Sequence, residues 1–252
     1  MRKILCESCP TRAHSILCDL APGTLGEFTA VGASAIYRPR QVVFAAGGPS
    51  EGLHLVCHGR VKLFCSDRFG HEHVLSVAGP GAVLGELSLD GEVVHAVSAE
   101  AVVESQLCFL PRDRLVRYLE KAPSVAIRLV AALSGELARA RRHVRDLALK
   151  GAESRLAAWL LELADGASSA NAVAAAAAGG ARPANGGLPV QRVGIPFSRR
   201  EIAEMIGVST ETAIRLLARL RERGAIAIER HAVAILDAER LARIARHDEV
   251  EA

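Results

Sequence analysis

The chain has 252 residues, of which 50% are hydrophobic and 23% charged, an ordinary composition for a soluble protein large enough for two cores. No apolar run reaches the roughly 18 residues that a membrane-spanning helix needs, and residues 1–10 lack the apolar segment of a signal peptide. We therefore expect a cytosolic protein. The formal net charge of +3 is too small to indicate a nucleic-acid partner by itself.

Residues 1–20 form a short arm with three of the six cysteines: Cys6 and Cys9 make a C-x2-C pair, and Cys18 follows after eight residues. Thiols in a reducing cytosol seldom form disulfides, so the cluster indicates metal or redox chemistry. Three thiolates leave a four-coordinate site incomplete. Cys108 is the candidate fourth ligand, and His14 is an alternative. Four thiolates suit a [4Fe–4S] cluster or a tetrahedral zinc ion.

From residue 35 to about residue 110, short β-rich runs alternate with turns that contain glycine and proline. This spacing is typical of a β-sandwich or barrel. Cys57 and Cys65 lie in these runs, and we expect both to pack in the core as small hydrophobic side chains. The predicted strands are Gln41–Phe44, Leu53–Cys57, Arg60–Cys65, His73–Val77, Val93–Ser98 and Ala101–Leu110.

A helical pattern begins near Asp113 and extends, with a break near Pro123, to about Lys150. Its apolar residues recur at alternating steps of four and three, the a/d seam of a helix that packs on a partner helix. Packing on the chain's own β-domain is the alternative; we favour parallel pairing in a homodimer. The seam consists of Ala126, Val130, Leu133, Leu137, Ala140, Val144 and Leu147.

A further helix is predicted over Glu153–Ala164. Residues 165–189 are dominated by alanine, glycine, serine and asparagine. The glycines favour a flexible loop, although Ala172–Ala178 could form a helical turn.

Capping signals define two short helices near the C-terminus. Ser198 and Glu201 make an S-x-x-E capping box at the start of the first helix, and Gly207 ends it and supplies a tight turn. Ser209 caps the second helix, which runs to Gly224. Two short helices around a glycine turn are the pattern of a helix-turn-helix.

Two predicted strands, Ala225–Glu229 and Ala232–Leu236, follow as the wing of a winged helix, and Asp237 can cap a last helix to Ala245. Eight arginines against five glutamates between residues 190 and 230 are consistent with phosphate binding. A helical hairpin used only for packing is the alternative, but caps, turn, wing and charge all favour DNA binding.

In a helix-turn-helix, the first residues of the second helix reach base edges in the major groove. Arg215 could pair with guanine and Glu211 could accept from the amino group of cytosine; the two could also pair with each other. The expected DNA contacts are Ser198, Arg199, Ser209, Thr210, Glu211, Thr212, Ile214 and Arg215.

The order of these segments resembles the Crp/Fnr family of transcription regulators, and the string VSTETAIRLLARL resembles its recognition helix, with the pattern E-x-x-[S/G]-R. Glu211 and Arg215 match, whereas Ile214 replaces the serine or glycine, so the outer positions of the half-site should differ from the Fnr-type TTGAT. The resemblance implies an α+β fold: a cyclic-nucleotide-binding-like β-barrel (jelly roll) over 21–112, a dimerisation helix over 113–150, and a winged helix-turn-helix domain over 151–252. It also implies a homodimer on palindromic promoter DNA that contacts RNA polymerase.

Barrels of the Crp type bind cyclic AMP through a G-E-L segment and a following Arg-Ser pair. This chain keeps Gly85-Glu86-Leu87 but has His95-Ala96 at the second place. Without the arginine and the hydroxyl, a phosphate lacks its charge-assisted hydrogen bonds. We therefore expect no cyclic-nucleotide binding.

Cys6, Cys9, Cys18 and Cys108 resemble by position the cluster ligands of the oxygen-sensing Fnr branch, and the eight-residue gap is close to that of rhizobial FnrN-like members. In that branch oxygen converts a [4Fe–4S] cluster to a [2Fe–2S] form and the active dimer is lost. Ala140 stands where Fnr relatives carry an acidic residue, so this seam should dimerise more readily.

The alternatives are a regulator that answers to a small effector such as a nucleotide or haem, and a zinc-stabilised regulator without redox sensing. We expect no enzyme, because the sequence has no P-loop, no Rossmann fingerprint and no nucleophile–base pair.

Overall fold

The computed structural model describes residues 30–70, 72–88, 91–177, 191–194, 197–228 and 232–246. The chain divides into two compact units, Met1–Arg142 and His143–Ala252, and each is described by itself. The arm with Cys6, Cys9 and Cys18 lies outside the described residues. Among the described helices, none is both long and apolar enough to span a membrane.

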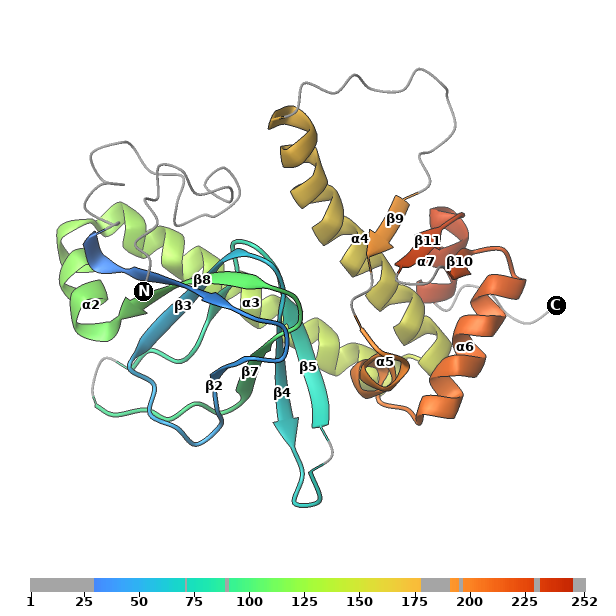
Figure 1. Ribbon diagram of the computed structural model, residues 1–252, viewed down its shortest axis with the longest axis horizontal. Coiled ribbons are helices and arrows are strands. Elements are labelled where there is room, and N and C mark those ends of the chain that lie inside the picture. The colour runs from blue at the N-terminus through green and yellow to red at the C-terminus, as the bar shows by residue number, and fades with distance from the viewer. Residues whose placement is uncertain are drawn as a thin grey trace. The chain divides into compact units, whose positions relative to one another are not determined.

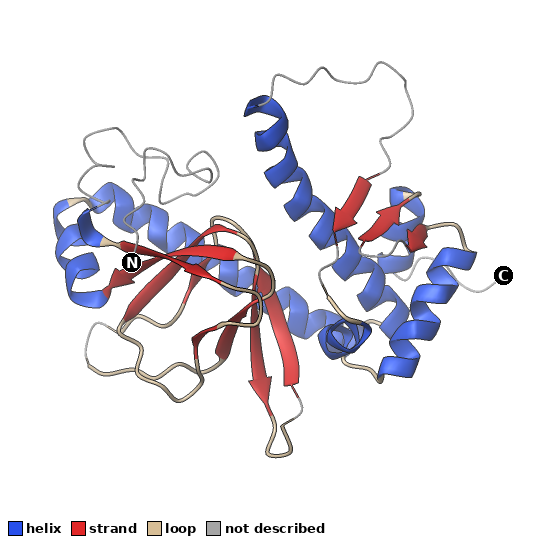
Figure 2. Ribbon diagram, viewed as in Figure 1, coloured by secondary structure: helices blue, strands red, loops and turns tan. Residues whose placement is uncertain are grey.

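The first unit is a sandwich of two four-stranded antiparallel sheets (Figures 1 and 2). The sheets do not close on each other, so the predicted jelly roll is an open sandwich, one of the two forms that the strand spacing predicted. In sheet order, the first sheet contains β1 (Ala33–Tyr37), β8 (Ser105–Pro111), β3 (Gly52–His58) and β6 (Val83–Leu84). The second contains β2 (Val42–Phe44), β7 (Ser98–Ala101), β4 (Val61–Ser66) and β5 (Glu72–Ala78).

One predicted strand, Val93–Ser98, is wrong over most of its length, because β7 begins only at Ser98. The backbone of the preceding residues bonds to a turn instead: the N–H of His95 donates to Gly48 O, and His95 O accepts from the N–H of Gly47. Strands β1 and β6 were not predicted, since β1 is rich in small residues and β6 has only two residues.

Strand β3 is buried on both faces, which explains its continuous apolar run. Leu53 and Leu55 pack against the helices that follow the sandwich, whereas Val56 lies in the cluster between the sheets. Those helices are α2 (Arg112–Lys121) and α3 (Pro123–Leu149).

The predicted helix break near Pro123 is confirmed. Ala122, between α2 and α3, has φ −127° and ψ 70°, outside the helical region. A residue that precedes proline is pushed away from helical angles, because the proline ring clashes with its backbone. The first turns of α3 pack on the sandwich through Val125 and Leu129.

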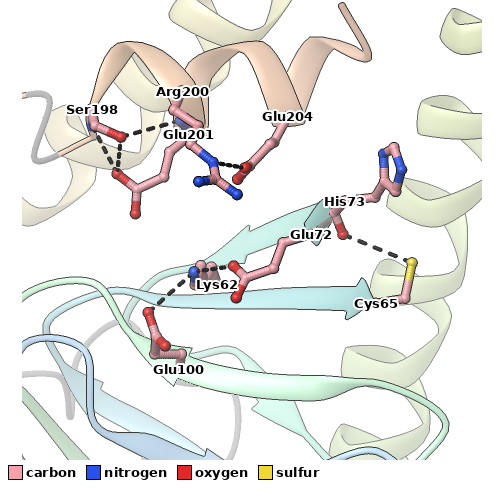
Figure 3. A network of polar contacts seen from close by, with 9 residues as sticks. All are labelled: Lys62, Cys65, Glu72, His73, Glu100, Ser198, Arg200, Glu201 and Glu204. Carbon is pink, nitrogen blue, oxygen red and sulfur yellow. Dashed lines mark hydrogen bonds and ion pairs between the residues drawn. The ribbon is translucent and has the colours of Figure 1, made fainter. Parts of the chain in front are cut away.

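A buried cation ties three strands of the second sheet together (Figure 3). Lys62 on β4 lies 2.8 Å from a carboxylate oxygen of Glu72 on β5 and 3.1 Å from one of Glu100 on β7. Burial alone lowers the pKa of Lys62, but hydrogen bonds and charge attraction from the two carboxylates outweigh it, and the pKa is raised. Lys62 is therefore a charged structural residue, a tie that links β4 to β5 and β7 through ion pairs.

The second unit contains helices around a three-stranded antiparallel sheet of order β10-β11-β9. Its helices are α4 (Ala152–Ala177), α5 (Arg199–Ile206), α6 (Thr210–Glu222) and α7 (Ala238–Arg246). Its strands are β9 (Gln191–Gly194), β10 (Ile226–Ile228) and β11 (Ala232–Ile235). The fully buried residues of this core include Leu156, Leu160, Ile202, Ile206, Leu217 and Leu241.

The predicted wing, final helix and capping residues are present, with two differences. The wing has a third strand, β9, which was not predicted. Helix α4 continues to Ala177, into the segment expected to be a loop from residue 165. Alanine has the highest helix propensity, so an established helix can propagate through this alanine-rich stretch despite its glycine. The rest of the expected loop, residues 178–189, lies outside the described residues.

Candidate DNA-binding surface and sensor residues

Local hydrogen bonds fix the entry to the helix-turn-helix. The Oγ of Ser198 accepts from the N–H of Glu201 at 3.2 Å, and a carboxylate oxygen of Glu201 accepts from the N–H of Ser198 at 2.7 Å (Figure 3). Gly207 then ends α5 in the left-handed conformation, with φ 66°. The Oγ of Ser209 accepts from the N–H of Thr212 at 3.2 Å and starts α6. The predicted capping box, turn and second cap are all confirmed.

One guanidinium binds two helix ends in this unit. Arg155 on α4 donates from Nε to Ile206 O, at the end of α5, at 2.9 Å, and from Nη1 to Lys150 O at 2.8 Å. Carbonyls at helix ends lack partners within their own helix, so such donors stabilise them. This role of Arg155 was not predicted; its only signal in the sequence is a charged residue within the alanine- and leucine-rich run of α4.

The first turns of α6 present the side chains expected to read bases. Glu211, Ile214 and Arg215 are exposed, and Ile214 keeps 49% of its surface. The guanidinium of Arg215 donates to Thr212 Oγ1 at 3.2 Å, so Thr212 holds it toward the start of the helix. Glu211 was the partner considered from the sequence.

The other predicted contacts lie at the starts of the two helices of the motif, α5 and α6. Ser198, Arg199 and Ser209 are exposed, and Thr210 and Thr212 are half-buried. Since a helix N-terminus carries unpaired N–H groups and a positive dipole end, the start of α6 suits a phosphate-lined groove.

In the sandwich, the carboxylate of Glu86 is held by the chain itself. One oxygen lies 2.6 Å from Nδ1 of His95, and the other accepts from the N–H of Ala96 at 3.0 Å. The ring of His95 stacks on Phe44, with centroids 3.9 Å apart. The two residues that replace the Arg-Ser pair thus bind the glutamate of the G-E-L segment. This pairing was not predicted.

A second buried imidazole lies beside this pair. His54 is 8% exposed, and its Nδ1 has no hydrogen-bond partner among the described residues. Phe44 and Phe109 flank its ring, at centroid distances of 5.6 and 4.8 Å. Burial, followed by the charge of nearby His95, lowers the pKa of His54 to about 4. His54 is therefore neutral at physiological pH.

Of the four predicted metal ligands, only Cys108 belongs to the described residues. It lies on β8, half-buried, and packs against the cluster that includes Val125 and Leu129 of α3. A Cβ placed on Gly32 would lie only 2.6 Å from the Cys108 sulfur, so only glycine fits beside the thiol. Gly32, just before β1, thus lies directly beside the Cys108 side chain. The described residues contain no ready-made group of three or more metal-binding side chains.

The two remaining described cysteines differ from each other. Cys57 is buried, as predicted. Cys65 is only half-buried on β4, with its sulfur 3.9 Å from the carbonyl oxygen of His73 (Figure 3), so its assignment to the core is wrong.

The predicted seam of α3 is an exposed apolar stripe within the single chain. Val130, Leu133, Leu137, Val144 and Leu147 keep between 41% and 65% of their surface, and Ala140 is also exposed. Packing on the chain's own β-domain therefore uses other residues, Val125 and Leu129. An apolar stripe of this length is unusual on a monomer surface and is typical of an interface.

A β-sandwich, a long helix with an exposed seam and a winged helix-turn-helix together define a DNA-binding regulator. Comparison with known proteins agrees. Residues 35–122 match the family description "Cyclic nucleotide-binding domain" and residues 154–244 match "Crp-like helix-turn-helix domain". The chain belongs to the Crp/Fnr family of transcription regulators, whose members bind DNA and typically act as homodimers.

Individual relatives carry different names. The "CRP-like cAMP-activated global transcriptional regulator" of Mycobacterium tuberculosis is 32% identical over 204 residues, 81% of this chain and 84% of the relative. The "Fumarate and nitrate reduction regulatory protein" of Salmonella typhimurium is 25% identical over 207 residues, 82% of this chain and 76% of the relative. The solved structure of FixK2 from Bradyrhizobium japonicum is 25% identical, with a TM-score of 0.69, and covers 88% of this chain and all of that one. These relatives are regulators and not enzymes, as predicted.

Proposed function

We propose that this regulator senses oxygen through a [4Fe–4S] cluster held by Cys6, Cys9, Cys18 and Cys108, and that the cluster controls its dimerisation on promoter DNA. The observation that carries the proposal is the contact of Gly32 with the Cys108 thiol. Fourteen positions separate Cys18 from Gly32, and an extended chain spans about 3.4 Å per residue, so the arm has ample length to return to Cys108. When bound, the cluster supplies an oxygen-labile iron–sulfur centre.

Cys108 connects such a site to the dimerisation helix. Its side chain packs against the cluster that contains Val125 and Leu129, in the first turns of α3. Close-packed interiors transmit small displacements, because they have few voids to absorb them. A change in how Cys108 is held therefore acts on α3 directly, without a separate relay.

The seam of α3 is the surface on which two copies would meet. Its exposed residues recur with the heptad spacing of a parallel helix pair. A homodimer presents two α6 helices to two half-sites, which is why such operators are palindromic. In each half-site Arg215 and Glu211 would read base edges, while Ser198, Arg199 and Ser209 would contact the backbone. By analogy with the family, the bound dimer would contact RNA polymerase.

A cyclic-nucleotide effector is the second candidate, because of the family domain and the name of the Mycobacterium relative. The contacts of Glu86 argue against it. Both of its carboxylate oxygens already have partners, His95 and the N–H of Ala96, and His95-Ala96 lacks the groups that would hold a phosphate.

The test is anaerobic purification of the full chain, followed by a visible spectrum, iron and sulfide analysis, and exposure to air. We expect about four irons per chain and absorbance near 400–420 nm that fades in air. Cys108→Ala should abolish the absorbance, whereas Cys57→Ala, a matched change of a buried cysteine in the same sheet, should keep it.

Two results would contradict the oxygen-sensing proposal. A Cys108→Ala variant with unchanged absorbance would remove Cys108 from the ligand set. A colourless protein with stoichiometric zinc would favour the zinc-stabilised alternative. Either outcome would leave the family membership and the DNA-binding motif intact.

A further inference from the structure

We propose that Glu153 on α4 is a positioning residue for DNA recognition: its carboxylate holds the side chains of two arginines at the end of α6, Arg219 and Arg223, and keeps them away from DNA phosphates. The inference rests on the proposed role of α6 as the recognition helix. Under this proposal Glu153 sets how well the protein distinguishes its own site from random DNA.

The contacts come from one carboxylate near the start of α4. Oε2 of Glu153 lies 3.3 Å from Nη1 of Arg219, and Oε1 lies 3.5 Å from Nη1 of Arg223. The second contact is an ion pair without the geometry of a hydrogen bond. The Glu153 side chain is only 19% exposed, whereas those of Arg219 and Arg223 are 55% and 36% exposed. A largely buried anion thus holds two cations that reach toward solvent.

The same end of α6 is fixed from a second side. Arg240 on α7 donates to the carbonyl oxygen of Arg223 and forms an ion pair with Asp237 at 3.5 Å. The backbone of α6 therefore keeps its position even when the Glu153 contacts are removed, and loss of Glu153 acts mainly on the two arginine side chains. A change in DNA binding after removal of the Glu153 charge can therefore be attributed to the two arginine side chains and not to unfolding of α6.

The position of Arg219 makes its restraint matter for DNA. It lies four residues after Arg215, and residues four apart are neighbours on one side of a helix. An unrestrained Arg219 would extend the basic surface that begins at Arg215. Each additional phosphate contact contributes affinity that is independent of sequence and adds about 0.9 to the slope of log affinity against log salt. Glu153 withholds this contribution, so sequence-independent binding stays weak relative to base reading.

The experiment measures binding of the anaerobically purified full chain to a random-sequence duplex over a range of salt concentrations. Glu153→Gln keeps the size of the side chain and removes its charge. We expect the salt slope to steepen by about 0.9 for each arginine released, and affinity at 0.1 M salt to rise roughly eightfold for each. Discrimination between random DNA and a duplex selected by the wild-type protein should fall accordingly.

Three further variants sharpen the test. Glu162→Gln removes the same charge from an exposed position on the same helix and should leave the slope unchanged. Arg219→Gln added to Glu153→Gln should remove the part of the gain that Arg219 supplies. Glu153→Asp retains the charge on a shorter side chain and should give an intermediate slope, which keeps the test informative if the glutamine variant folds poorly.

An unchanged slope in Glu153→Gln, or an equal rise in Glu162→Gln, would overturn the inference. So would a triple variant, with Glu153, Arg219 and Arg223 all replaced by glutamine, whose salt slope is as steep as that of Glu153→Gln alone. Failure of the underlying assignment looks different: Arg215→Gln would then leave the preference for the selected duplex intact, whatever Glu153 does.

Discussion

The seam of α3 allows a quantitative test of the proposed dimer. Leu137 is 52% exposed in the single chain and lies at the middle of the stripe. Complete burial of a leucine contributes about 1.5–3 kcal/mol, so burial of the exposed half contributes about 0.8–1.5 kcal/mol for each chain. Because Leu137→Ala changes both chains of a dimer, it should weaken association by about 1.5–3 kcal/mol, which is roughly a 10- to 150-fold increase in the dissociation constant.

The assay is sedimentation of the anaerobic protein over a concentration series, with DNA binding measured in parallel. Leu149→Ala is the matched control, because Leu149 lies on the same helix, off the seam, and is 73% exposed. It should leave association unchanged. If the two variants associate equally well, or if Leu137→Ala lowers the stability of the fold without weakening association, the stripe is not the dimer interface. The reasoning from its heptad spacing is then wrong.

Three other predictions follow from buried or seam residues. Because the pKa of His54 is about 4 when folded and near 6.5 when unfolded, the neutral ring stabilises the fold above pH 6.5, and about 3 kcal/mol of this is lost as the pH falls toward 4. His54→Phe should flatten that fall relative to wild type in urea titrations, and parallel curves would contradict it. Ala140→Asp should place two carboxylates about 8 Å apart in a parallel dimer and weaken association roughly 30-fold in sedimentation, an effect of about 2 kcal/mol; undiminished association would argue against parallel pairing. Lys62→Met should leave Glu72 and Glu100 without their shared cation and destabilise the sandwich by about 3 kcal/mol; a change below about 1 kcal/mol in thermal or urea unfolding would show that the tie contributes little.

The helix-turn-helix was predictable from sequence because its signals are local. Ser198, Glu201, Gly207 and Ser209 act on backbone groups within three or four residues, so the caps and the turn can be recognised from spacing alone. The exposed seam was predictable for the same reason, since heptad spacing belongs to one helix.

The contacts between distant segments were not predictable. Glu153 reaches Arg219 across 66 positions, and no pattern within either helix indicates the pairing. The pairing of strands was also not predictable: β9 (Gln191–Gly194) pairs with β11 (Ala232–Ile235), which lies far away in the sequence. The strand pattern is also the same for two open sheets as for a closed barrel, so the sequence could not distinguish them. Helix α4 was underestimated because glycine and serine suggested a loop, whereas its alanines carry the helix to Ala177.

The hydrogen bonds of Glu86 to His95 and Ala96 affect how strongly this protein can bind nucleotides in the cell. A nucleotide that used this carboxylate would first have to separate it from His95 and from the N–H of Ala96, and would then regain only what it had broken. Exchanging these internal hydrogen bonds for bonds to a nucleotide yields little net binding affinity, because His95 and Ala96 belong to the same chain and are already in place. We therefore expect the regulator to stay indifferent to swings in cellular cyclic nucleotide. A change in cyclic AMP that activates its cyclic-AMP-activated relative would therefore leave this regulator unaffected, and this regulator could respond to a different signal.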